Sequence, residues 1–176
     1  ARGLSEFRHT VEAIPHYTDE KNVVLFEKQK VLSRAEIASR QEVLLESYAK
    51  TLMVESLTMI ELVKKDILPA VLRYQNLLAS DRNLKLASGL KISTLPEDTL
   101  LSRIAENAET LFLRLEKLEE DAERGKEIED HLKAAEFARE VLFEDMASLR
   151  ETVDTLECLV AREIWPFPSY AEILYS

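Results

Sequence analysis

The sequence contains few of the residues that break regular structure or build reactive sites. Among 176 residues there are three glycines, five prolines and one cysteine. Because an all-β fold needs frequent Gly and Pro turns, this scarcity argues against that class. A glycine-rich loop for nucleotide phosphates is disfavoured for the same reason. The lone cysteine, Cys158, has no internal disulfide partner, and we expect it to act as a small hydrophobe among the apolar positions of the last helix.

Long hydrophobic runs and an excess of basic residues are also missing. No stretch approaches the ~18 apolar residues of a membrane span, and the start has no signal-peptide pattern. The 33 acidic residues outnumber the 23 basic ones, and the formal charge of −10 opposes contact with nucleic acids and anionic membranes. We therefore expect a cytoplasmic protein with neither nucleic acid nor membrane as a partner. The start ARGLSEF, which lacks a methionine, indicates a piece of a longer chain.

The abundant residues are Leu, Glu, Ala and Lys, which are strong helix formers, and the length suits about one domain. We therefore predict an all-α fold, a bundle of long antiparallel helices. Its main element is one helix over residues 33–80, opened by a capping box between Ser33 and Glu36. Pro69 is expected to kink this helix within the turn of residues 65–69. Its apolar stripe consists of residues three, four or seven apart: Ile37, Leu44, Tyr48, Leu52, Met59, Val63, Ile67, Val71 and Leu78.

The chain before this helix is predicted to be weakly structured by itself. Residues 1–32 read as a short helix, which Pro15 ends, and a connector. Such a short helix is marginal in water, so its apolar edge must dock on the bundle. The bundle domain itself is assigned to residues 33–176, and a loop follows Ser80.

Two further helices are predicted after that loop. Thr94 and Glu97 form a second capping-box pattern, which opens a helix over residues 94–124. Gly125 is placed to end this helix, and the last helix then covers residues 126–160. Because the connection is short, we expect these two helices to form an antiparallel hairpin that packs along the first.

The end of the chain, residues 161–176, is predicted to be a C-terminal aromatic and proline strap. Trp165 and Phe167 each precede a proline, and this restricts both to extended backbone. We expect these two aromatic side chains to pack on the bundle, because exposing them would create a large apolar patch.

The residues alone predict no catalytic, cofactor-binding or metal site. A di-metal site in a helical bundle needs a Glu-x-x-His pair from each of two helices. Only Glu6 and His9 make such a pair, since His131 has Glu127 four residues before it instead of three. Two interpretations remain open at this point. The chain is either a helical appendage of a larger protein or a free-standing adaptor or scaffold bundle.

Three stretches carry a resemblance to a known family. They are FRHTVEAIPHYTDEKNVVLFEKQKVLSRAEIASRQEVLLESYAKTL, ESLTMIELVKKDILPAV and IWPFPSYAEIL. In this order they resemble the C-terminal region of type III glutamine synthetases. The most specific parts, residues 55–71 and 165–174, supply the structural and interface candidates: Glu55, Thr58, Met59, Pro69, Trp165, Pro166, Phe167 and Tyr170.

The resemblance implies a role within a larger enzyme. Glutamine synthetases join ammonia to glutamate with ATP and a divalent metal such as Mg, through a γ-glutamyl phosphate. The metal-binding and phosphate-contacting residues of that family lie upstream of the region matched here, so no catalytic, cofactor or metal residue is transferred to this chain. Type III enzymes are large ring-forming oligomers. The implied role is a non-catalytic helical domain that braces its own catalytic domain, with contacts in a homo-oligomer.

Overall fold

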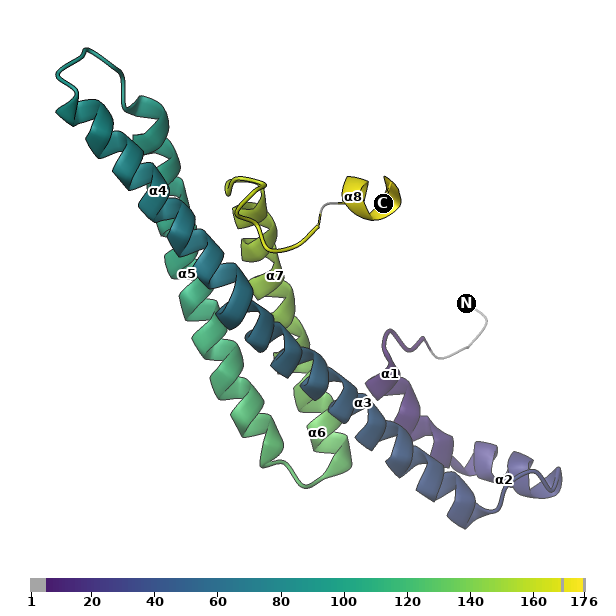
Figure 1. Ribbon diagram of the computed structural model, residues 1–176. Coiled ribbons are helices and arrows are strands. Elements are labelled where there is room, and N and C mark those ends of the chain that lie inside the picture. The colour runs from purple at the N-terminus through teal and green to yellow at the C-terminus, as the bar shows by residue number, and fades with distance from the viewer. Residues whose placement is uncertain (1–5, 169, 176) are drawn as a thin grey trace. The chain divides into compact units, whose positions relative to one another are not determined.

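The computed structural model describes residues 6–168 and 170–175, and all regular structure in these ranges is helical (Figure 1). The predicted all-α class is confirmed. The α-helices are α1 (Thr10–Ala13), α2 (Glu20–Lys28), α3 (Arg34–Leu62), α4 (Leu68–Ala87), α5 (Leu95–Lys126), α6 (His131–Phe137), α7 (Phe143–Glu157) and α8 (Tyr170–Tyr175). A 3₁₀ turn covers Ile14–Thr18, and π-helical turns cover Val63–Ile67 and Ala138–Leu142. Within the described residues, no helix is both long and apolar enough to cross a membrane.

The helices group into two compact units. Unit 1 contains the described part of Ala1–Ser56 together with Glu120–Glu144. Unit 2 contains Leu57–Glu119 and the described part of Asp145–Ser176. The helices α3, α5 and α7 each contribute residues to both units. The domain boundary proposed before residue 33 stays a prediction.

The start of α3 is held as the sequence predicts. The carboxylate of Glu36 accepts from the Ser33 amide at 2.7 Å and from the Ser33 hydroxyl at 2.8 Å. The Glu36 amide donates in return to the Ser33 hydroxyl oxygen at 3.4 Å. These reciprocal bonds satisfy amides that the first helical turn leaves unpaired, so the capping box is confirmed. The same bonds from Ser33 lower the pKa of Glu36.

Unit 1 has a core that joins the N-terminal segment to α3 and α6. Val11 and Ile14 are buried together with Leu45 of α3 and Ala135 of α6. Tyr48, Ala49 and Leu132 pack against this cluster and are partly buried. The short N-terminal segment therefore docks on longer helices, which supply the apolar burial that four residues of α1 lack.

Gly125 does not end a helix, and that prediction is wrong. The helix α5 continues through it to Lys126, and α6 begins at His131 with the Asp130 carboxylate accepting from the Lys133 amide at 2.9 Å. Gly125 is instead a point of close packing. A Cβ atom there would lie 2.9 Å from Met53 Cε and 3.1 Å from Phe137 Cε1.

In unit 2, α5 is antiparallel to α4 and to α7. Ion pairs join Lys64 to Glu119 and Lys85 to Glu97. The residue with the higher number on the first segment is paired with the residue with the lower number on α5, so the two segments run in opposite directions. Figure 1 shows α4 and α5 side by side, joined by a turn at one end. On the other flank of α5, Arg114 donates from Nη1 to the Thr152 hydroxyl of α7 at 2.8 Å. This is the arrangement expected of the predicted hairpin.

The apolar stripe of the first long helix is mostly buried, with one error. Leu44 is 40% exposed, whereas Leu45 is 3% exposed. The buried side of the helix runs from Ile37 past the partly buried Gln41 to Leu45, and later through the buried Ser56. Because two of these positions are polar, a pattern based on apolar residues alone predicts that Leu44 is buried instead of Leu45.

A π-helical turn, Val63–Ile67, lies directly before Pro69. The Leu68 amide donates to the Val63 carbonyl, five residues back. Proline cannot donate to the ladder, and a wider turn before it is a common way to absorb that loss. The kink predicted at this place stays a prediction.

The end of the chain differs from the prediction at Cys158. The helix α7 ends at Glu157, and Cys158 beyond it is exposed, so its assignment to an apolar helix position is wrong. Residues 161–168 are non-helical and residues 170–175 form the helix α8, and the aromatic and proline strap stays a prediction.

Candidate functional site

One groove in unit 2 gathers three of the predicted interface residues. Met59, Trp165 and Phe167 all line it, and its volume is about 420 Å³. We name it the Trp165 groove. Its other lining residues come from the α3 to α4 junction, from α7 and from the tail: Leu62, Val63, Ile67, Arg150, Val153, Asp154, Glu157, Pro168 and Ile173.

The floor of the groove is apolar and its charged residues come from α7. Val63 and Ile67 are buried, and Trp165 is only 7% exposed. Arg150 donates from Nε to the Asp154 carboxylate at 3.3 Å. The exposed Glu157 adds a second carboxylate on the same helix. An apolar floor with a few polar groups is typical of sites that take an apolar side chain or ligand.

Arg162 fixes the tail that forms one wall. The amides of Ile164 and Trp165 both donate to the Ala161 carbonyl, at 2.9 and 3.1 Å, and this turns the chain back after α7. Arg162 then donates from Nη1 to the Phe167 carbonyl at 2.8 Å and pairs with Glu172 of α8. Sequence reasoning missed Arg162, since an exposed arginine five residues before an aromatic has no motif of its own.

The other predicted interface residues do not join this groove. Glu55 is exposed on α3 in unit 1, and Thr58 is exposed in unit 2. Pro69 is partly buried in the first turn of α4, and Pro166 is exposed. The backbone of Tyr170 begins α8, but its side chain lies outside the described residues. Their assignment as interface residues stays a prediction.

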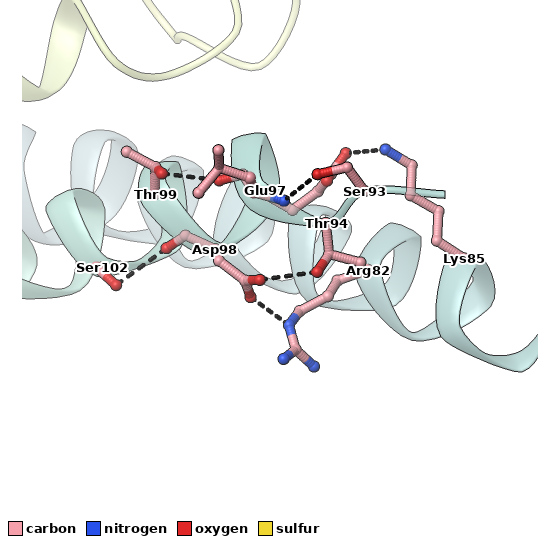
Figure 2. A network of polar contacts seen from close by, with 9 residues as sticks. Arg82, Lys85, Ser93, Thr94, Glu97, Asp98, Thr99 and Ser102 are labelled. Carbon is pink, nitrogen blue, oxygen red and sulfur yellow. Dashed lines mark hydrogen bonds and ion pairs between the residues drawn. The ribbon is translucent and has the colours of Figure 1, made fainter. Parts of the chain in front are cut away.

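A second polar cluster locks the turn between α4 and α5 (Figure 2). Arg82 pairs with Asp98, Lys85 pairs with Glu97, and the Thr94 hydroxyl donates to Asp98 at 2.8 Å. The Arg82 guanidinium and then the Thr94 hydroxyl lower the pKa of Asp98, and Lys85 lowers the pKa of Glu97.

This cluster corrects two predictions. The capping box at Thr94 is wrong, because Glu97 pairs with Lys85 of α4, and the Ser93 hydroxyl accepts from the Leu95 amide at 3.3 Å. The loop after Ser80 is also shorter than predicted, since α4 continues to Ala87. This stretch is helical although its apolar period is lost, and Arg82 and Lys85 within it form ion pairs with α5.

The described residues offer no cluster that fits a metal ion. Among residues 6–168 and 170–175, no three His, Cys, Asp or Glu side chains gather closely enough to hold a metal ion. His9 serves as the N-cap of α1, where its Nδ1 accepts from the Glu12 amide at 3.3 Å.

Comparison with known proteins shows what the chain is similar to. Residues 1–85 match the family model described as the glutamine synthetase C-terminal domain. The match covers 85 of the 176 residues. The type III resemblance is confirmed as well, because a type-3 glutamine synthetase of Dictyostelium discoideum is 31% identical over 179 residues, which is 99% of this chain.

Two bacterial glutamine synthetases match over the same share of the chain. The protein of Butyrivibrio fibrisolvens is 28% identical over 181 residues, and that of Bacteroides fragilis is 27% identical over 179 residues. The chain spans about a quarter of the length of these glutamine synthetases, between 24% and 25% in each case. The similarity thus extends beyond residue 85 to the helices that line the Trp165 groove.

Proposed function

We propose that this chain is the C-terminal region of a glutamine synthetase and that it braces the catalytic part of that enzyme without taking part in chemistry. The parent reaction would be the ATP-dependent ligation of ammonia to glutamate, in the cytoplasm and in a homo-oligomer. The observation that carries the proposal is the alignment of 99% of this chain with about a quarter of each relative. ATP and Mg would be held by residues of the parent outside this chain.

The cores of the two units support a structural role. Long helices with continuous apolar seams give rigid elements, and α5 alone presents six fully or nearly fully buried residues over five turns: Ile104, Ala108, Leu111, Leu115, Leu118 and Ala122. A rigid element can hold a neighbouring domain in one orientation. A metal-dependent catalytic role would need His, Cys, Asp or Glu side chains brought together, and the described residues offer no such cluster.

A surface of α3 in unit 1 is suited to contact the catalytic part. Val43 is 58% exposed and Val54 is 62% exposed, and both border a shallow hollow that Glu55 also lines. Glu46 and Lys50, which lie between these two valines in the sequence, form an ion pair of 2.6 Å with each other. Apolar side chains with a charged rim are the composition of an interface that forms within a protein.

Two experiments test this proposal. The 176-residue chain should form no glutamine from glutamate, ammonia and ATP with Mg, and any turnover above the level without protein would contradict the non-catalytic role. In the parent enzyme, Val54→Glu should lower thermal stability of the catalytic part, while Leu113→Glu, at a similarly exposed position of α5, should not. Equal effects of both substitutions would contradict the assigned surface.

A further inference from the structure

The Trp165 groove has the size and composition of a small-molecule site. Its volume of about 420 Å³ lies within the ~300 to 1,000 Å³ of typical ligand pockets. Nine of its twelve lining residues are apolar, and the other three are the charged residues of α7. Every lining residue belongs to unit 2, so one compact unit forms the whole groove. A ligand of this groove therefore needs an apolar body and a small number of polar atoms.

The floor of the groove is formed at the π-helical turn between α3 and α4. Val63 and Ile67 are the first and last residues of this turn, and they are 1% and 4% exposed. The buried Trp165 lines the groove with them. Single π-helical turns within α-helices are frequent at functional sites. The two ends of this turn and the indole thus give a ligand an apolar surface that is ordered before binding.

The charged residues of the groove are not balanced. Arg150, Asp154 and Glu157 are four and then three residues apart, so they follow one face of α7. The Arg150 guanidinium pairs with the Asp154 carboxylate at 3.3 Å. In the part of the chain that the structure describes, no ion pair or hydrogen bond joins the exposed Glu157 carboxylate to another side chain. One positive and two negative residues leave the groove with a formal charge of −1.

This balance favours a cation over an anion or a neutral ligand. An anion would meet two carboxylates, and its one cationic partner, Arg150, already binds Asp154. A neutral ligand would gain nothing from the Glu157 charge. A cation is attracted by Glu157, although only modestly, because that carboxylate is exposed to water. The aromatic rings of Trp165 and Phe167 also attract cations to their faces.

We propose that the Trp165 groove binds a small organic ammonium ion with an aliphatic or aromatic body. The apolar body lies against Val63, Ile67 and Trp165, and the ammonium group approaches the Glu157 carboxylate. The ligand is a free molecule and not a lysine side chain of another polypeptide, because a pocket of this volume encloses a whole small molecule. The site does not depend on the bracing role, since binding is measured without glutamine formation.

Three probes that share one alkyl chain test the charge preference. Hexylammonium, hexanol and hexanoate are titrated into the 176-residue chain, and binding is followed by the fluorescence of Trp165, its only tryptophan. Hexylammonium should change the emission to saturation. Hexanol should bind about two- to fivefold more weakly, and hexanoate should bind more weakly still. Equal affinities for the three probes, or a change that does not saturate, would overturn the proposal.

Charge variants of α7 should shift the affinity in opposite directions. Glu157→Gln should weaken hexylammonium binding about two- to fivefold and leave hexanol binding unchanged. Arg150→Gln removes the positive charge and releases the Asp154 carboxylate, so hexylammonium should bind more tightly. Glu163→Gln makes the same change in net charge as Glu157→Gln, at an exposed position outside the groove, and should bind like the wild type. Circular dichroism checks that each variant is folded. Equal effects of Glu157→Gln and Glu163→Gln would overturn the assigned site.

Calorimetry on the intact parent enzyme separates a free ligand from a covering polypeptide. Hexylammonium should bind the parent with the affinity that it has for the 176-residue chain, and Glu157→Gln should weaken this binding too. Binding that is present in the chain but lost in the parent would mean that the parent itself fills the groove. That result would overturn the assignment to a free ligand.

Discussion

Arg162 and Phe167 are joined by a hydrogen bond of 2.8 Å from the Arg162 Nη1 atom to the Phe167 carbonyl oxygen. The same guanidinium pairs with Glu172, so one side chain binds both the aromatic segment and the helix that follows it. This link positions the wall of the Trp165 groove. It also makes the tail testable through the only tryptophan of the chain, Trp165.

Replacing Arg162 should loosen the tail. Arg162→Ala removes the bond to Phe167 and the pair with Glu172, and we expect a red shift of Trp165 fluorescence with a loss of about 0.5 to 1.5 kcal/mol in the free energy of unfolding. Arg162→Lys should restore little, because an ammonium lacks the forked donors of guanidinium. Arg73→Ala, an exposed arginine of α4, is the control. An unchanged emission spectrum in Arg162→Ala would show that the tail does not depend on this residue.

Trp165 should contribute strongly to stability. Because its side chain is buried against the α3 to α4 junction, Trp165→Ala should lower the free energy of unfolding by roughly 3 to 5 kcal/mol in chemical denaturation. Phe112→Ala removes an aromatic ring that is 46% exposed, and its cost should stay below about 1 kcal/mol. Similar losses in the two variants would mean that Trp165 is not packed as described.

Gly125 should resist replacement by alanine. Alanine is a better helix former by about 1 kcal/mol, but its Cβ would collide with Met53 and Phe137. We expect Gly125→Ala to destabilise by about 1 to 2 kcal/mol in thermal or chemical unfolding. The same substitution in a Met53→Ala background should be less costly, because the closest contact is removed. A Gly125→Ala protein that is more stable than the wild type would show that Met53 and Phe137 leave room for a Cβ atom.

The ion pairs between α4 and α5 at Arg82 and Lys85 should make the free energy of unfolding depend on pH. The pKa values of Asp98 and Glu97 are lowered in the folded chain, so their stabilisation is fully present above their unfolded pKa values, near 4, and is lost as pH falls through the folded values. Unfolding measured from pH 6 down to pH 3 should therefore show a weaker pH dependence in Asp98→Asn and in Arg82→Gln than in the wild type. If the free energy of unfolding changed with pH equally in the variants and in the wild type, the ion pair between Arg82 and Asp98 would be contradicted.

Much of the fold follows from the sequence because its signals are local. The capping box at Ser33 depends on residues within one helical turn, and it is found as predicted. The errors arise where partners are distant in sequence. Glu97 has the spacing of a capping box, but Lys85 on another helix takes its carboxylate.

The candidate site could be predicted only in part. Trp165 is large and apolar, and its burial was expected from its residue type alone. Arg162 was missed because its partners, a backbone carbonyl and Glu172, come together only when the chain turns back after α7. The role of Gly125 was missed for a similar reason, since Met53 and Phe137 approach it from two other helices.

The most direct test of the bracing role is the parent enzyme without this region. All of residues 1–176 should be removed together, because Val11 and Ile14 share a core with Leu45 and Ala135. We predict that the truncated parent loses most of its glutamine formation and its normal oligomer, measured by product assay and sedimentation. A truncated parent that assembles and forms glutamine at the rate of the intact enzyme would contradict the account.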